Sequence, residues 1–141
     1  MSDAEPSAIV FDYGDIEIDA RRAKTVANLC RSDLMKVAVQ VVRRGGENNL
    51  HSHPHRDEIF FVLSGRVRVY STDDELIADI GRHEGVLIPR GFPYWFESVG
   101  DDVLELLQVA AADAPSKLTG PFGGRSNHTP RVKGRAEDRL V

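Results

Sequence analysis

The stretch GGENNLHSHPHRDEIFFVLSG, residues 45–65, decides the fold. It sets two histidines, His51 and His53, two positions apart and a carboxylate, Glu58, five residues further on. Alternate side chains of a strand point to the same face, so the two imidazoles can lie together. Pro54 interrupts strand pairing, and we expect the chain to turn there and re-enter as a strand near Glu58. Two imidazoles and one carboxylate suit a divalent transition metal, which makes His51, His53 and Glu58 the predicted ligands.

Short runs rich in β-branched and aromatic residues lie on both sides of this stretch, separated by glycine and proline turns. Strands at roughly ten-residue spacing with such turns predict an all-β antiparallel sandwich or barrel. We expect strands at residues 34–42, 58–63, 66–70, 76–80, 85–88, 94–98 and 103–109. One helix is predicted, over residues 20–29.

The spacing of residues 45–65 resembles the first motif of the cupin superfamily. That motif reads Gly, five residues, His-x-His, three or four residues, Glu, six residues, Gly, and every fixed position has its counterpart between Gly45 and Gly65. The resemblance implies a cupin-like double-stranded β-helix, a jelly-roll barrel. It also implies a homodimer that exchanges N-terminal strands, for which residues 8–18 have the apolar content.

The second cupin motif is only partly present. Pro89 and Gly91 stand in place, but His83 replaces the leading glycine and Ser98 the final asparagine. Tyr94 stands where cupins carry their remaining metal-binding histidine. The resemblance therefore implies a small, single-domain cupin whose second motif lacks one metal ligand.

Three roles are open for Tyr94. It can ligate the metal as a phenolate, donate a hydrogen bond beside the metal or substrate, or mark a pocket that has lost its metal. We favour the second role and predict Tyr94 as the catalytic side chain. His55, which follows Pro54, is a further candidate ligand if its loop folds inward, and otherwise a solvated loop residue.

Four side chains are predicted to contact a substrate. Phe60 shares the inward face of Glu58 by strand parity. Gln40 and Gln108 are amides in apolar strands, where they either satisfy structural hydrogen bonds or supply polar groups to a pocket. Arg68 would bind an anionic substrate if it faced the cavity, whereas on the outer face it would be an ordinary surface charge.

The composition excludes several classes of function. The chain has 141 residues, 41% of them hydrophobic and 28% charged, and a formal net charge of −4, which predicts one soluble domain and argues against nucleic-acid binding. No apolar run spans a membrane, the N-terminus is acidic, and Cys30 is the single cysteine, so we expect a cytoplasmic protein. We divide the chain into an N-terminal arm (1–33), the barrel (34–112) and a basic tail rich in proline and glycine (113–141).

The expected function is that of a metal-binding cupin acting on a small organic molecule. A non-haem Fe(II) dioxygenase is the first hypothesis, since two histidines and a carboxylate leave coordination positions open for substrate and dioxygen. A metal-dependent isomerase, lyase or cyclase is the second, with Mn, Ni or Zn as other candidate metals. A non-catalytic binder of small molecules is the third.

Overall fold

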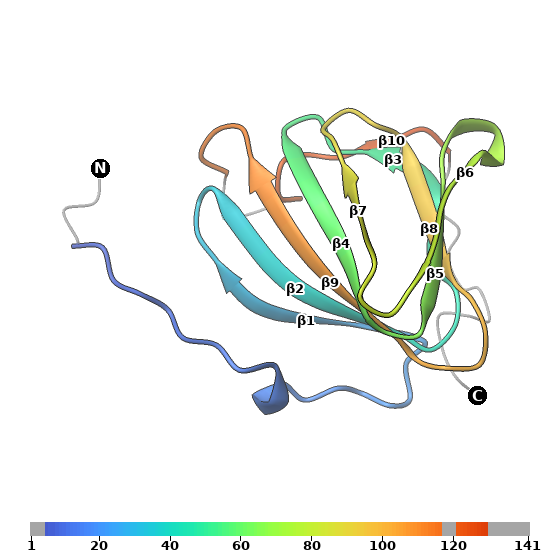
Figure 1. Cartoon of the computed structure of the whole chain (residues 1–141). Helices are drawn as coiled ribbons and strands as arrows, with labels where there is room; N and C mark the ends of the chain where they lie inside the picture. The colour runs from blue at the N-terminus through green and yellow to red at the C-terminus, as the bar shows by residue number, and fades with distance from the viewer. Residues whose placement is uncertain (1–4, 117–120, 130–141) are drawn as a thin grey trace.

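The computed structural model describes residues 5–116 and 121–129. Two five-stranded antiparallel sheets face each other, in the orders β1-β2-β9-β4-β7 and β10-β3-β8-β5-β6 (Figure 1). This confirms the all-β double-stranded β-helix. The strands are β1 (Lys24–Arg31), β2 (Met35–Val42), β3 (Gly46–Ser52), β4 (Arg56–Ser64), β5 (Arg66–Tyr70), β6 (Leu76–Gly81), β7 (Gly85–Ile88), β8 (Tyr94–Ser98), β9 (Leu104–Ala112) and β10 (Ser126–Asn127), and the two 3₁₀ turns are η1 (Tyr13–Asp15) and η2 (Thr72–Asp74).

The interior of the barrel has an apolar half and a polar half. Strand β4 passes from one to the other: its buried side chains Arg56 and Glu58 belong to the polar half, and Phe60 and Val62, further along the strand, belong to the apolar half. The apolar half is one continuous cluster of side chains that exclude water. Its buried members are Val42, Phe60, Val62, Val67, Val69, Ile88, Tyr94, Phe96, Leu104 and Leu106.

A second apolar layer lies outside the first sheet. Tyr13, Ile16 and Ile18 pack against a cluster that includes Val39 and Val41, the residues of β2 that alternate with the inward-facing ones. The Tyr13 hydroxyl donates a hydrogen bond to Glu105 Oε1 at 2.6 Å. The chain thus contacts the barrel from η1 onward, on the outer face of β1, β2 and β9.

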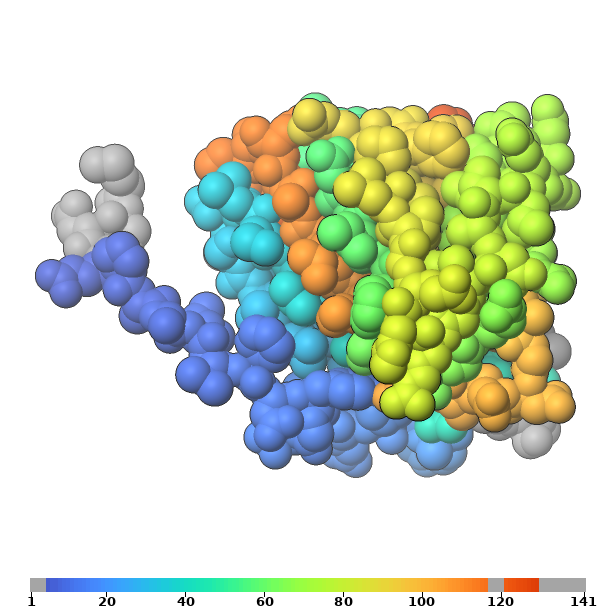
Figure 2. Space-filling view, viewed as in Figure 1, coloured from blue at the N-terminus to red at the C-terminus, as the bar shows by residue number. Residues whose placement is uncertain are grey.

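Residues 5–12 extend away from the barrel (Figures 1 and 2). Ile9, Val10 and Phe11 are exposed there, Val10 to 95%. An exposed apolar run of this kind is typical of a segment that pairs with another surface. The strand-exchanged homodimer stays a prediction.

The predicted helix over residues 20–29 is wrong. This segment overlaps β1, which pairs antiparallel with β2 through a register that places Val26 opposite Gln40 and Ala27 opposite Val39. Ala27 is buried against Val39 and Val41, so the packing available at the edge of the sheet overrides the local helical preference. The barrel therefore extends beyond residues 34–112 at both ends, since β10 also comes from the tail.

Each strand expected from the sequence after residue 33 has its counterpart, and three of them, Arg66–Tyr70, Gly85–Ile88 and Tyr94–Ser98, match at both ends. Among the described residues there is no helix of the length and apolar character needed to cross a membrane.

Candidate functional site

His51 and His53 meet at the polar half of the barrel, as the strand parity predicts. His51 lies in β3 and His53 just after it, and the two ring centroids are 5.1 Å apart. The backbone fixes both rings, because His51 Nδ1 bonds the carbonyl oxygen of Asn49 at 2.8 Å and His53 Nδ1 bonds that of Gly124 at 2.7 Å. A carbonyl can only accept, so each Nδ1 carries the proton and each Nε2 presents a lone pair.

Arg56 bridges the second histidine and the carboxylate. Its Nη2 donates to His53 Nε2 at 2.9 Å and lies 2.9 Å from Glu58 Oε2. Its Nη1 donates to the carbonyl oxygen of Phe122 at 2.9 Å. The ion pair is almost completely withdrawn from water, with side-chain exposures of 8% and 1%. A buried carboxylate requires such a partner, and here the partner is a guanidinium.

Tyr94 and two glutamines complete the network around Glu58. The Tyr94 hydroxyl donates to Glu58 Oε1, and Gln108 Nε2 donates to Glu58 Oε2 at 2.8 Å. Gln40 Nε2 in turn donates to Gln108 Oε1 at 3.1 Å. A row of buried hydrogen bonds therefore runs from β2 through β9 to β4 and β8, and both oxygens of the carboxylate are used.

Burial sets the protonation of the reactive groups. It lowers the pKa of His51 to about 4 and also lowers that of His53, on which the positive charge of Arg56 acts in the same direction. Burial and then the negative charge of Glu58 raise the pKa of Tyr94 well above its usual value. Near neutral pH the site thus holds two neutral imidazoles and a neutral phenol.

The ligand types for a metal are present, but their arrangement does not fit one. Two of the three predicted ligand atoms, His53 Nε2 and Glu58 Oε2, already bind the guanidinium of Arg56. Nowhere in residues 5–116 and 121–129 does a group of three or more His, Cys, Asp or Glu side chains have a geometry able to hold a metal ion. A metal at this position would have to displace Arg56, so the metal stays a prediction.

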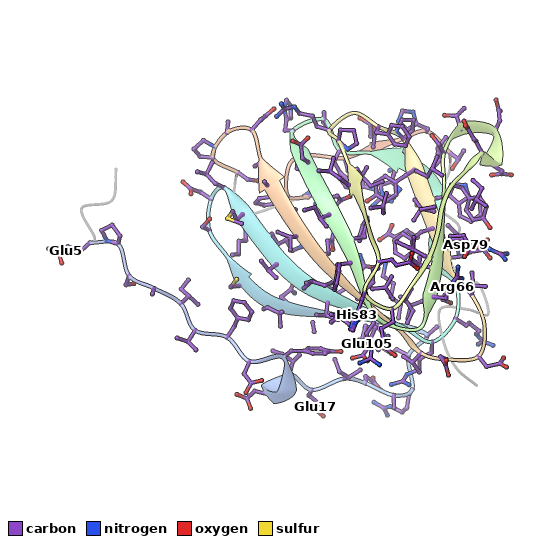
Figure 3. The ribbon with its side chains drawn as sticks, viewed as in Figure 1. Glu5, Glu17, Arg66, Asp79, His83 and Glu105 are labelled. Carbon is purple, nitrogen blue, oxygen red and sulfur yellow. The ribbon has the colours of Figure 1, made fainter. Side chains whose placement is uncertain are left out.

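Two predicted site residues lie elsewhere. His55 is exposed and pairs with Asp113 at 3.3 Å, outside the cluster, so its assignment as a ligand is corrected. Arg68 lies on the outer face of β5 and pairs with Asp79 at 3.3 Å, so the assignment to substrate binding is corrected too. Figure 3 shows Arg66 beside the same Asp79 on this outer surface.

The remaining predicted residues lie at or beside the site. Tyr94, Gln40 and Gln108 belong to the hydrogen-bonded network just described. Phe60 packs at its apolar border, 5.8 Å from the Tyr94 ring and 5.6 Å from the Phe96 ring. The Phe60 ring therefore packs against the Tyr94 ring from the apolar half of the barrel, and Phe60 is only 1% exposed.

Sequence reasoning missed Arg56 and the contribution of the tail. Arg56 lies two residues before Glu58, so the parity that assigns Phe60 to the inward face also assigns Arg56 to it. The tail contributes the carbonyl groups of Phe122 and Gly124, and nothing in its glycine- and proline-rich composition indicates those contacts.

Comparison with known proteins supports the class of protein that this fold and site define, a small jelly-roll barrel with a polar interior site. Residues 38–110 match the family described as "Cupin domain", and the chain belongs to that family.

Among solved structures, an uncharacterized conserved protein with a double-stranded beta-helix domain from Klebsiella pneumoniae shares 14% identity at a TM-score of 0.68, covering 88% of this chain and all of that one. Pac13 of Streptomyces, described as a unique nucleoside dehydratase, shares 11% identity at a TM-score of 0.63, covering 86% of this chain and 91% of that one. Both likenesses show the fold.

A curated relative matches a smaller part of the chain. Mannose-1-phosphate guanylyltransferase 2 of Escherichia coli O157:H7 is 33% identical over 78 residues, which are 55% of this chain. These residues make up only 16% of that protein, so the match covers a barrel-sized part of a much longer enzyme.

Proposed function

We propose that this cupin is an enzyme of the isomerase or lyase class, which moves protons on a small organic molecule through its own side chains. The observation that carries the proposal is the position of Arg56 between His53 and Glu58. The guanidinium takes the lone pairs that a metal would need, and it leaves His51 Nε2 and the Tyr94 hydroxyl as the groups able to exchange protons.

The rings that carry these two groups are direct neighbours. The His51 and Tyr94 ring centroids lie 4.4 Å apart, and this supports the proposal that one small substrate meets both residues. The neutral imidazole of His51 would accept a proton from a carbon next to a carbonyl. The neutral phenol would turn its single O–H from Glu58 Oε1 to the substrate oxygen on which negative charge develops, and Arg56 and Gln108 would continue to hold the carboxylate. Returning the proton to a neighbouring carbon gives an isomerase, and loss of a leaving group gives a lyase.

The comparison with Pac13 supports the lyase branch only in a general way, since a dehydratase removes water by proton transfer. At 11% identity the likeness is one of fold, and it does not indicate a nucleoside substrate for this chain.

The proposal is tested by proton exchange in D₂O. A panel of small 2-oxo and 3-hydroxy acids is incubated with the protein, and loss of C–H signals is followed by NMR. We expect exchange on at least one compound, reduced by about 100-fold or more in Tyr94→Phe and in His51→Gln. Tyr70→Phe, a change to a tyrosine that stacks on Trp95 away from this site, is the matched control. Equal exchange in wild type and Tyr94→Phe would reject the proposal.

A metal-dependent reaction, including the Fe(II) dioxygenase expected from the sequence, is the second candidate. One observation favours it, because both histidines donate Nδ1–H to backbone carbonyls, as metal-binding histidines do. Metal analysis of untagged protein separates the candidates. We expect Arg56→Ala to bind Fe(II) or Zn(II) at least tenfold more tightly than wild type. About one firmly held metal per wild-type chain would favour the second candidate instead.

The homodimer is also retained as a proposal, on the exposed apolar run Ile9, Val10 and Phe11. The molar mass in solution, measured by light scattering, tests it directly.

A further inference from the structure

The edge strand β1 carries a bulge where it runs beside β2 (Figure 1). The register of the two strands shifts between Asn28 and Cys30, so that Leu29 is an extra residue with no counterpart on β2. A β-bulge bends its strand and interrupts the ladder, and bulges recur next to functional sites. Regular pairing resumes directly after the bulge, with Arg31 opposite Lys36.

A cavity lies at this bulge. Its volume is about 370 Å³, within the range of small-molecule sites. The lining consists of the bulge and the first residue pair after it, namely Asn28, Leu29, Cys30, Arg31 and Lys36. Four of these residues belong to β1, and Lys36 is the one that β2 contributes. A small molecule in the cavity would therefore lie beside a primary amine.

Lys36 is half-buried and differs from Lys24, the other lysine in the described part of the chain. Lys24 Nζ forms an ion pair with Glu47 Oε1 at 2.8 Å. Lys36 forms no ion pair with a carboxylate of residues 5–116 and 121–129. The second cation of the cavity, Arg31, lies with its guanidinium 5.1 Å from the Phe122 ring, and a guanidinium stays protonated. Lys36 thus supplies the one amine of the lining that can become a nucleophile.

The surroundings of Lys36 favour its neutral form. Burial first, and then the positive charges of Arg56 and Arg31, lower the pKa of Lys36. Glu58 acts in the opposite direction and is already paired with Arg56. Ala110, which faces Lys36 from β9, carries no charge. Burial near other cations is one of the ways in which proteins activate a lysine as a nucleophile.

We propose that Lys36 is a nucleophilic lysine that binds small aldehydes covalently in this cavity as imines. The neutral amine attacks the carbonyl carbon, its two protons leave with the carbonyl oxygen as water, and a C=N bond to Nζ remains. The step requires neither an oxidant nor a reductant. It is a second activity, separate from the proton transfer proposed for His51 and Tyr94, and it does not rest on that proposal.

The test is reductive trapping with the full chain near neutral pH. The protein is incubated with propanal and sodium cyanoborohydride, which reduces an imine to a stable secondary amine, and modified lysines are located and timed by peptide mass spectrometry. We expect Lys36 to be modified at least about tenfold faster than Lys24, whose amine is held by Glu47. A rate at Lys36 no higher than that at Lys24 would overturn the proposal.

Variants test the part that the cavity plays. Lys36→Arg retains the charge without a primary amine, and it should lose this adduct while the rate at Lys24 stays unchanged. Asn28→Phe places a ring in the lining and should slow the modification of Lys36 several-fold. Val26→Phe adds the same ring to an exposed position of β1 outside the lining and should leave the Lys36 rate unchanged.

A wild-type rate at Lys36 in folded Asn28→Phe, or equal slowing by Asn28→Phe and Val26→Phe, would mean that the cavity does not bind the aldehyde, and the proposal would fail. Circular dichroism checks that each variant is folded. The comparison of Lys36 with Lys24 uses the wild-type protein, so it decides the proposal even if Asn28→Phe does not fold.

Discussion

The two halves of the barrel interior are built by the same strands and held together by different forces. In β4, Phe60 and Val62 pack into the apolar cluster, where stability follows from the area withdrawn from water. Glu58 and Arg56, two and four residues before Phe60, are also buried but depend on one another for their hydrogen bonds and charge. The apolar half therefore tolerates gradual change, whereas the polar half depends on complete pairing.

The largest expected effect follows from breaking the pair in the polar half. Glu58→Leu leaves the Arg56 cation buried and unpaired, and it should lower the free energy of unfolding by about 3–5 kcal/mol in denaturant titrations. Phe60→Leu removes apolar volume without exposing a charge and should cost less, about 1–2 kcal/mol.

The double variant Arg56→Met with Glu58→Leu sharpens the comparison. Removing the buried cation together with its partner should recover about half of the loss or more, because no unpaired charge then remains in this pair. The remaining cost is that of neutral groups: the Tyr94 hydroxyl and the Gln108 amide lack an acceptor, and His53 Nε2 and the Phe122 carbonyl lack a donor. If the double variant is as unstable as Glu58→Leu alone, then unpaired charge is not what distinguishes the two halves.

The next effect is a dependence of stability on pH. The folded protein holds the pKa of His51 at about 4 and also lowers that of His53, whereas an unfolded histidine has a pKa of about 6.5. As the pH falls below about 6.5 the unfolded chain takes up protons that the folded chain does not, so stability must fall. We expect a loss of about 2–3 kcal/mol between pH 6.5 and 4.5.

The chosen pH range separates histidines from carboxylates. Burial alone would raise the pKa of Glu47, but Lys24 and Arg125 hold it at about 2, so its ion pairs remain intact throughout the range. His51→Gln should flatten the pH dependence, and His55→Gln, at an exposed position, should not change it. A wild-type protein equally stable at both ends of the range would contradict the burial of neutral imidazoles.

The sequence predicted the local part of this site and not the part that depends on distant chain segments. Spacing alone was enough to place His51, His53 and Glu58 in one site, since strand parity and one turn relate their positions. Strand β1 was missed because its pairing with β2, and not its own composition, makes it a strand. The tail was missed because Phe122 and Gly124 act through carbonyl groups, which every residue type provides.

The smallest effect tests how closely that tail packs on the polar half. Gly123 has a φ of +72°, and a Cβ added there would lie 2.6 Å from Arg56 Cβ. Gly91 is the matched control, because its φ of +79° is equally unfavourable for alanine but nothing lies within 4 Å of an added Cβ. Gly91→Ala should cost about 1–2 kcal/mol from backbone conformation alone, and Gly123→Ala should cost about 1 kcal/mol more because the tail must move off Arg56. Thermal unfolding of both variants measures the difference. Equal losses would mean that the strands alone fix Arg56, whereas a larger loss in Gly123→Ala makes the tail a structural part of the polar half and ties the position of the guanidinium to it.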